Sequence, residues 1–238
     1  MRLLLALSWA FLLVAAQAAG PVQIDILYDN TSIRPDLEAD WGFAALVSIG
    51  GHRVLLDTGA NDGVFMKNLK AMGVDPASIE HLVISHEHGD HTGAVAQLSQ
   101  LNPKMKVHRP VLNQGPFQVV PGVYSTGALP GPAVEQALAV ETPKGLVVIT
   151  GCSHPGVVAL VEAAEKQRNA NSVRLLIGGY HLLKMDAGQI QGVIAGLKRL
   201  NVREAVATHC SGDLATKMFR DAFGPGPGAG AGRHIILE

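Results

Sequence analysis

The chain has 238 residues, of which 47% are hydrophobic and 16% charged, so it can bury a sizeable core and we do not expect it to be disordered. A formal net charge of −1 and an aromatic content of 5% argue against a nucleic-acid partner, which needs a basic surface or stacking platforms. We therefore expect a small-molecule substrate. The composition leaves the oligomeric state open.

The first 18 residues have the pattern of a secretory signal peptide. Arg2 precedes an apolar run at 3–16, and Ala16-Gln17-Ala18 forms a small-x-small cleavage site. The alternative is a membrane anchor, but the run is shorter than the roughly 20 residues of a membrane span. We predict cleavage after Ala18, no stable membrane anchor, a secreted or periplasmic location and a single domain over 19–238.

The beginning of the mature chain is rich in β-forming residues. Three such segments lie at 22–28, 43–49 and 52–57, and the first two are separated by a polar loop. After Asp57 the pattern changes, because Phe65, Leu69 and Met72 recur on one face of a helix predicted over 62–72. From this point strands and helices alternate.

From residue 80 onward one unit recurs four times: an apolar strand, a histidine just after its end, and a helix. The four strands are predicted at 81–85, 146–150, 174–178 and 205–208. The histidines that follow them are His86, His154, His181 and His209. Strands of this kind tend to bring their carboxyl ends to a common edge, so we expect the four side chains to gather there. A Gly/Pro-rich loop at 224–232 and a last strand at 233–238 complete the chain.

The segment HEHGDH, residues 86–91, carries the strongest chemical signal. His86 and His88 are two apart in an extended strand end, so both can bind one metal. Gly89 permits a sharp turn, after which Asp90 and His91 can reach a second metal. Imidazole and carboxylate ligands suit zinc, with manganese or iron as alternatives. A His-rich surface loop would not explain the three later histidines.

Four histidines and two cysteines lie outside these ligand motifs. We interpret four histidines as structural or solvent-facing: His52, His81, His108 and His234. Cys152 precedes His154 by two residues and Cys210 directly follows His209, so both cysteines are predicted to lie close together near the metal edge. Two cysteines cannot form a disulfide framework, and whether they pair is left open.

The motifs resemble a known family. SHEHGDHTG, preceded by LLDTG, is similar to the signature of the metallo-β-lactamase superfamily. TGCSHPG, GGYHL and THCSG resemble the subgroup named after 7,8-dihydropterin-6-methyl-4-(β-D-ribofuranosyl)-aminobenzene-5'-phosphate synthase. The resemblance implies a four-layer αββα sandwich that holds two divalent metal ions at one edge.

The resemblance also implies a ligand set for each metal. The first metal would be bound by His86, His88 and His154, and the second by Asp90, His91 and His209. Asp57 of the DTG motif would lie behind the ligands and hold one of the histidines in its orientation.

His181 departs from the family pattern. Much of the superfamily has a metal-bridging Asp at this strand end, but here the sequence reads GGYH. A neutral imidazole has one free lone pair and bridges two metals poorly, so His181 either binds one metal or contacts the substrate. Asp186 is a remote alternative acid. With one carboxylate fewer, the second metal is expected to be held less tightly.

These residues predict hydrolytic chemistry. Two metals lower the pKa of a bound water toward about 7, and Asp90 would orient the resulting hydroxide while His181 contacts the developing oxyanion. No GxSxG motif accompanies Ser85, Ser153 or Ser211, so no serine nucleophile competes. The sequence therefore predicts an exported hydrolase that uses a metal-bound hydroxide on phosphoesters or other small esters. The alternatives are a lactam or lactone hydrolase and a non-catalytic metal-binding or redox protein.

Overall fold

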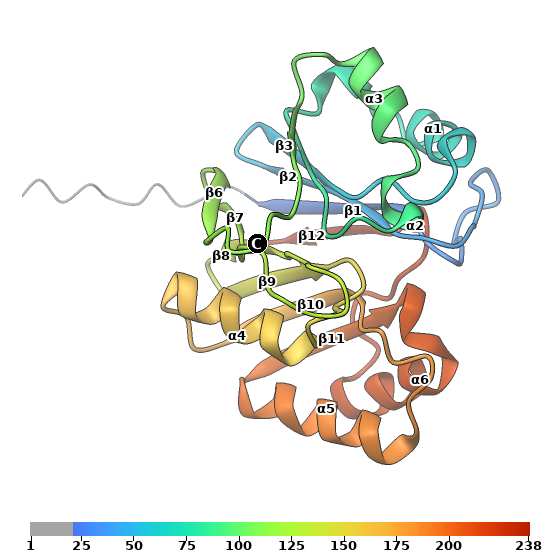
Figure 1. Cartoon of the computed structure of the whole chain (residues 1–238). Helices are drawn as coiled ribbons and strands as arrows, with labels where there is room; N and C mark the ends of the chain where they lie inside the picture. The colour runs from blue at the N-terminus through green and yellow to red at the C-terminus, as the bar shows by residue number, and fades with distance from the viewer. Residues whose placement is uncertain (1–20) are drawn as a thin grey trace, which may run out of the picture.

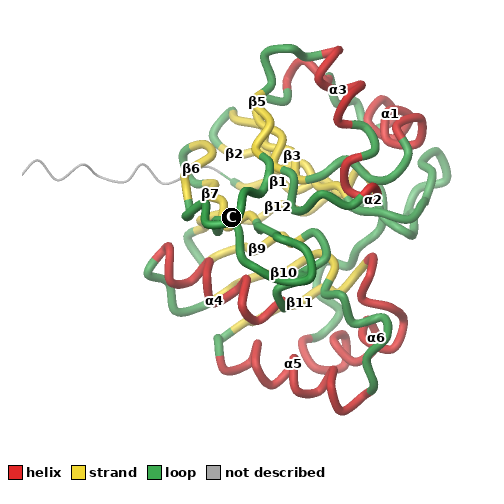
Figure 2. Tube along the Cα trace, in the orientation of Figure 1, coloured by secondary structure: helices red, strands yellow, loops and turns green. Residues whose placement is uncertain are grey.

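Two six-stranded sheets face each other in the middle of the molecule, and helices cover both outer sides (Figures 1 and 2). The computed structural model describes residues 21–238, so the predicted signal peptide lies outside the described residues. The first sheet consists, in spatial order, of β12 (His234–Leu237), β1 (Val22–Tyr28), β2 (Ala44–Ile49), β3 (His52–Leu56), β4 (His81–Val83) and β5 (Lys106–His108). The second consists of β11 (Val202–Thr208), β10 (Val173–Gly179), β9 (Gly145–Thr150), β8 (Leu138–Thr142), β7 (Val123–Ser125) and β6 (Phe117–Val120).

The helices divide between the two sheets. On the first sheet lie α1 (Asp62–Ala71), the single-turn α2 (Gly89–Thr92) and α3 (Val95–Leu101). On the second lie α4 (Val157–Arg168), α5 (Ala187–Arg199) and α6 (Gly212–Phe223). Short 3₁₀ turns span Pro76–Ser78 and His209–Ser211. The αββα sandwich expected from the family resemblance is confirmed.

Alternation along the strands builds three apolar layers. In β2, Ala45 and Val47 face the core between the sheets, whereas Leu46 packs under α1 and α3. In β9, Val147 faces the same central core and Val148 packs under the helices of the second sheet. Because both faces of the sheets are buried, the strands are almost continuously apolar in sequence.

The predicted elements agree closely with the structure, with one gap. The strands and helices expected before residue 102 and after residue 144 are all present. No strand was predicted where β5 to β8 occupy residues 106–142 as short strands of three to five residues. Segments of this length carry too few residues for a reliable two-residue period, and their pairing is decided by the sheet they join.

The strands that precede the signature residues run parallel within each sheet. β3 pairs with β4, and β10 pairs with both β9 and β11. Their carboxyl ends lie at one edge of the sandwich, as expected from the recurring unit. Within residues 21–238, no helix is both long and apolar enough to cross a membrane.

Candidate metal centre

Two adjacent sets of metal-ligating atoms lie at this edge. The first set is formed by His86, His88 and His154, and the second set by Asp90, His91 and His209. In each set, one ligand atom per residue can be chosen so that all of them lie within 4.8 Å of one another. The structure thus brings together the two ligand sets that the family resemblance implied.

The first set is a cluster of three imidazole rings. The ring centroids of His86 lie 4.6 Å from His88 and 4.5 Å from His154, and those of His88 and His154 are 4.7 Å apart. His86 is fully buried, while His88 is exposed to solvent. Burial and the nearby His91 lower the pKa of His86 to about 3, so its ring is neutral and free to bind a metal.

Asp57 fixes the orientation of two histidines. One carboxylate oxygen lies 2.7 Å from His91 Nδ1 and accepts a hydrogen bond of 2.6 Å from the Ser85 hydroxyl. Since that hydroxyl donates to Asp57, it accepts from His86 Nδ1 at 2.9 Å. Asp57 therefore holds the Nδ1 proton on His91 directly and on His86 through Ser85, and it leaves both Nε2 lone pairs free.

Glu135 orients His154 as Asp57 orients His91, and the sequence did not predict this role. This fully buried carboxylate lies 2.8 Å from His154 Nδ1 and accepts the backbone N–H groups of Cys152, Ser153 and His154. Burial opposes its ionisation, but these hydrogen bonds and His86 outweigh it and lower the pKa of Glu135 to about 2. The only sequence signal is an acid within the mostly apolar segment 133–140.

In the second set two lone pairs face each other. His91 Nε2 and His209 Nε2 are 3.3 Å apart, and the Nδ1 atom of each ring is engaged elsewhere. His209 Nδ1 lies 3.0 Å from Asn30 Oδ1, which can only accept, so the proton of His209 is on Nδ1. Asp90 Oδ2 lies 3.4 Å from His209 Nε2 and 3.8 Å from His91 Nε2. Asn30 could not be distinguished in sequence from an ordinary loop residue.

The nitrogen and oxygen atoms of the two sets suit a divalent cation as ligands. Among residues 21–238, the buried His86 Nε2 atom has no hydrogen-bond partner, although buried polar atoms nearly always have one. Facing lone pairs on His91 and His209, beside the Asp90 carboxylate, repel one another unless positive charge lies between them. Both observations would be explained by divalent cations held at this edge.

Strained backbone accompanies the site. Asp57, Ser153, His181 and His209 all have positive φ angles, between 51° and 68°. This conformation costs an L-residue about 1–2 kcal/mol and is typically found at functional sites. Each of these residues lies at or just after a strand end, where the turn directs side chains toward the site.

The two cysteines lie side by side, as predicted, and are not joined by a disulfide. Cys210 Sγ is 3.6 Å from the Cys152 carbonyl oxygen. A Cβ atom on Gly179 would lie 2.7 Å from the Cys210 sulfur, so only glycine fits there. The Cys152 sulfur reaches further into the site and lies 3.2 Å from His91 Nε2.

His181 lies at the exposed rim, beside the first set. Its ring centroid is 4.4 Å from that of His154, and its ligand atoms group with those of Cys152 and His154, not with the second set. Asp186 is not part of the site: its carboxylate caps α5 by accepting the Gln189 backbone N–H at 2.8 Å. The rim thus offers an imidazole where the family resemblance implies an aspartate.

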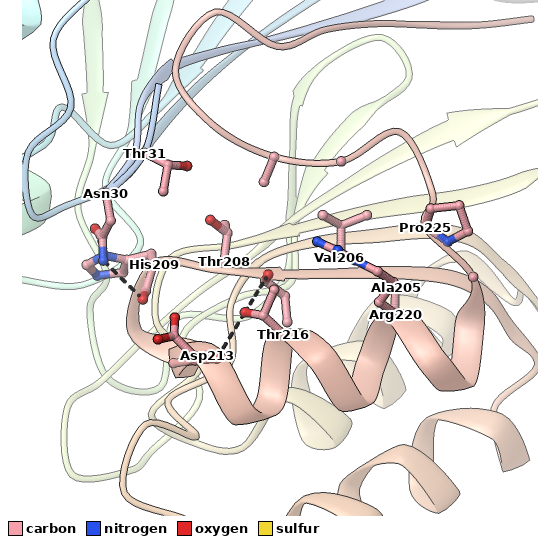
Figure 3. Close-up of a pocket in the computed structure, with 15 residues that line it drawn as sticks. Asn30, Thr31, Ala205, Val206, Thr208, His209, Asp213, Thr216, Arg220 and Pro225 are labelled. Atoms are coloured by element: carbon pink, nitrogen blue, oxygen red, sulfur yellow. Dashed lines mark hydrogen bonds between the residues drawn. The ribbon is translucent and has the colours of Figure 1, made fainter. Parts of the chain in front are cut away.

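A pocket of about 260 Å³ lies on the far side of His209 (Figure 3). Asn30 and His209 line one end, and Arg220 and Pro225 line the other. Of the residues in the two sets, only His209 borders this pocket. It is therefore separate from the edge where the two sets converge.

The sequence model of the metallo-beta-lactamase superfamily matches residues 42–168. The chain belongs to this superfamily. The match includes DTG, HEHGDH and GCSH, which supply Asp57, all of the first set, and Asp90 and His91. His209, outside the match, joins them through the fold.

Three similar proteins each match most of this chain. The 7,8-dihydropterin-6-methyl-4-(beta-D-ribofuranosyl)-aminobenzene-5'-phosphate synthase of Methanocaldococcus jannaschii is 27% identical over 72% of this chain and 79% of its own length. The crystal structure of Tm1679, a metal-dependent hydrolase of the beta-lactamase superfamily, is 26% identical, with a TM-score of 0.72 over 90% of this chain and 98% of that one. Zn²⁺-bound PqqB from Methylobacterium extorquens shares the fold at 13% identity, with a TM-score of 0.54 over 91% and 99% of the two chains.

Proposed function

We propose that this protein is an exported, metal-dependent hydrolase of small esters, with phosphoesters as the first substrates to test. The observation that carries the proposal is the convergence of unshared Nε2 lone pairs from His86, His91 and His209 on one exposed edge. Superfamily membership and the similarity to Tm1679 support the same chemistry. We propose two divalent ions, of zinc or alternatively of manganese or iron.

Bound metal ions would supply an activated water and a Lewis acid for the carbonyl or phosphoryl oxygen. Asp90 is placed to hold and move the proton of an attacking water, because its carboxylate is half-exposed and lies beside His91 and His209. Burial opposes its ionisation, but the neighbouring imidazoles of His209 and His91 outweigh it and lower the pKa of Asp90 below its usual range. Asp90 therefore works as a carboxylate at neutral pH.

Three exposed side chains surround the site and would contact the substrate. His88 and His181 present imidazoles on the side of the first set. On the side of the second set, Trp41 is 46% exposed and donates its indole N–H to Asp90 Oδ2 at 2.9 Å. The centroid of its ring lies 4.9 Å from that of the His209 ring. We propose that His181 donates a hydrogen bond to the developing oxyanion, while the Trp41 ring packs against the leaving group.

A panel of substrates tests this proposal. The protein without residues 1–18 would be purified, its metal content measured, and its activity assayed on chromogenic phosphodiesters, phosphomonoesters, lactones and a cephalosporin. We expect metal-dependent turnover of at least one phosphoester. Turnover of lactones or the cephalosporin alone would favour the lactam and lactone alternative. Metal binding without any turnover would favour a non-catalytic metal-binding or redox protein.

The proposed location rests on residues 1–18. Intact-mass measurement of exported material should find a chain that begins at Ala19. A membrane-bound species that retains residues 1–18 would contradict the cleavage prediction. Such a result would leave the hydrolase proposal itself intact, because no residue of either set lies in that segment.

A further inference from the structure

The Cys152 sulfur occupies the space between the two sets. It joins Asp90, His91 and His209 in one group of ligand atoms and His154 and His181 in another, each within 4.8 Å. The residue is 3% exposed. A buried thiol in this position borders both proposed metal positions.

The surrounding structure fixes the position of this sulfur. The Cys152 backbone N–H donates to Glu135 at 2.8 Å, and the same carboxylate holds the next two residues. Behind it, Cys210 packs against the Cys152 carbonyl, and Ser153 adopts a φ of 68°. The loop is therefore built to hold residue 152 as firmly as it holds His154.

We propose that Cys152 is a thiolate ligand of the second metal and completes a four-ligand set with Asp90, His91 and His209. This inference rests on the metal binding proposed above. It adds a sulfur ligand that is not among the ligands implied by the family resemblance.

Two physical arguments favour a sulfur ligand. Zinc readily accepts four-coordinate sites of nitrogen, oxygen and sulfur ligands. With the Asp90 carboxylate and the Cys152 thiolate, the ligands carry two negative charges, which balance a divalent cation. Cys152 would then supply the negative charge that is missing because His181 replaces an aspartate.

A simpler interpretation is a hydrogen bond from the thiol to His91. Because Asp57 holds the proton on His91 Nδ1, its Nε2 atom can accept from the Cys152 S–H across the observed 3.2 Å. That hydrogen bond describes the metal-free state. A metal ion that binds a thiol displaces its proton, so the same sulfur would then be available as a thiolate ligand.

Cobalt substitution distinguishes the two interpretations. The metal-free wild type, Cys152→Ser and Cys210→Ser would each be titrated with Co²⁺. The titration would follow the thiolate-to-cobalt charge-transfer absorption band in the near ultraviolet. We expect the band in the wild type and in Cys210→Ser, and its loss in Cys152→Ser. Cys210→Ser is the matched control because Cys210 is the other buried cysteine at this edge.

A second variant guards against misfolding. Cys152→Asp restores a negatively charged ligand, so we expect this variant to bind two Co²⁺ ions per chain without the charge-transfer band. Cys152→Ser should bind the second ion at least tenfold more weakly than the wild type does. Circular dichroism would verify the fold of each variant. A wild type that binds two Co²⁺ ions without the band, or a band lost only in Cys210→Ser, would overturn the inference and leave the proposed function standing. A wild type that binds no metal would overturn both.

Discussion

The two sets at the edge of the sandwich differ in charge and in exposure. The first set consists of three imidazoles, one of which, His88, is open to solvent. The second set contains the Asp90 carboxylate and has the Cys152 sulfur beside it, and both of its histidines are buried. A neutral, open site and a charged, enclosed site thus lie next to each other.

This difference suggests a division of labour. Structural zinc sites usually have four protein ligands, whereas catalytic sites keep one position open for water or substrate. By this rule the first metal, with three protein ligands, would be the one that admits water and substrate. The second metal would mainly stabilise negative charge and position Asp90. Single-residue variants and metal removal test this division.

Removing a ligand of the open site should have the largest effect. We expect His86→Ala to bind one metal instead of two and to lose at least 10³-fold in kcat, a loss of about 4 kcal/mol in transition-state stabilisation. Metal analysis and steady-state kinetics would measure both. His52→Ala is a suitable control, because His52 pairs with Glu80 on the surface and lies at the start of β3, at the opposite end of the strand from Asp57. Full metal content and activity in His86→Ala would refute the ligand assignment.

Glu135→Gln should weaken the loop that carries His154. The change removes the negative charge of a carboxylate that accepts hydrogen bonds from three backbone N–H groups and from the His154 ring. We therefore expect a loss of about 2–3 kcal/mol in the free energy of unfolding. Metal affinity should fall about 10–100-fold. Urea unfolding and metal titration would test this. Glu141→Gln, whose carboxylate pairs with Arg168 near the surface, should change neither quantity by much.

Chelation should remove the two metals in a fixed order. Because His181 stands where a bridging aspartate was expected, the sequence predicts that the second metal is lost first. If Cys152 is a ligand, the order is reversed, because two negative ligands hold the second metal and none holds the first. Stepwise dialysis against a chelator, followed by metal analysis, gives the order. Loss of the second metal first would support the original expectation and count against a thiolate ligand.

Trp41→Phe should have a modest effect on the enclosed site. The change keeps the ring beside His209 but removes the hydrogen bond to Asp90. Because Trp41 is half-exposed, we expect about a fivefold change in kcat/KM, equivalent to about 1 kcal/mol. The pH profile of kcat is the informative measurement, since freeing Asp90 should shift its acidic limb upward. An unchanged profile would assign Trp41 to packing alone.

The smallest effect concerns two histidines outside the site. His81 Nδ1 lies 2.8 Å from His108 Nε2, and burial together with neighbouring Lys106 lowers the pKa of both rings. A pKa below the unfolded value of about 6.5 means that stability is fully present above that pH and falls as the pH drops below it. His81→Gln combined with His108→Gln should therefore flatten this fall only slightly, because the contact between the two rings is only partly buried. Thermal unfolding between pH 5 and 8 would show whether the slopes differ.

Much of this architecture was determined by the sequence. The periods of the long strands and helices, the recurring strand–histidine–helix unit and the HEHGDH spacing predict the elements and a metal site at a shared strand edge. Local rules suffice for these, because burial of both sheet faces requires apolar strands and because residues just after parallel strands gather at one edge. The αββα sandwich and the two ligand sets were implied by the resemblance to the metallo-β-lactamase superfamily. The placement of His52 and His234 in surface ion pairs also agrees with the structural role predicted for them.

Other features were decided only by the tertiary structure. Glu135 and Asn30 lie 19 and 179 residues from the histidines they orient, so no local pattern could reveal them. The position of the Cys152 sulfur between the two sets, and of His181 beside the first, depends on how two sheets pack against each other. Sequence periodicity specifies which face of an element a side chain lies on. Which side chains then meet across the interface depends on register and backbone turns, including the positive φ angles at the strand ends.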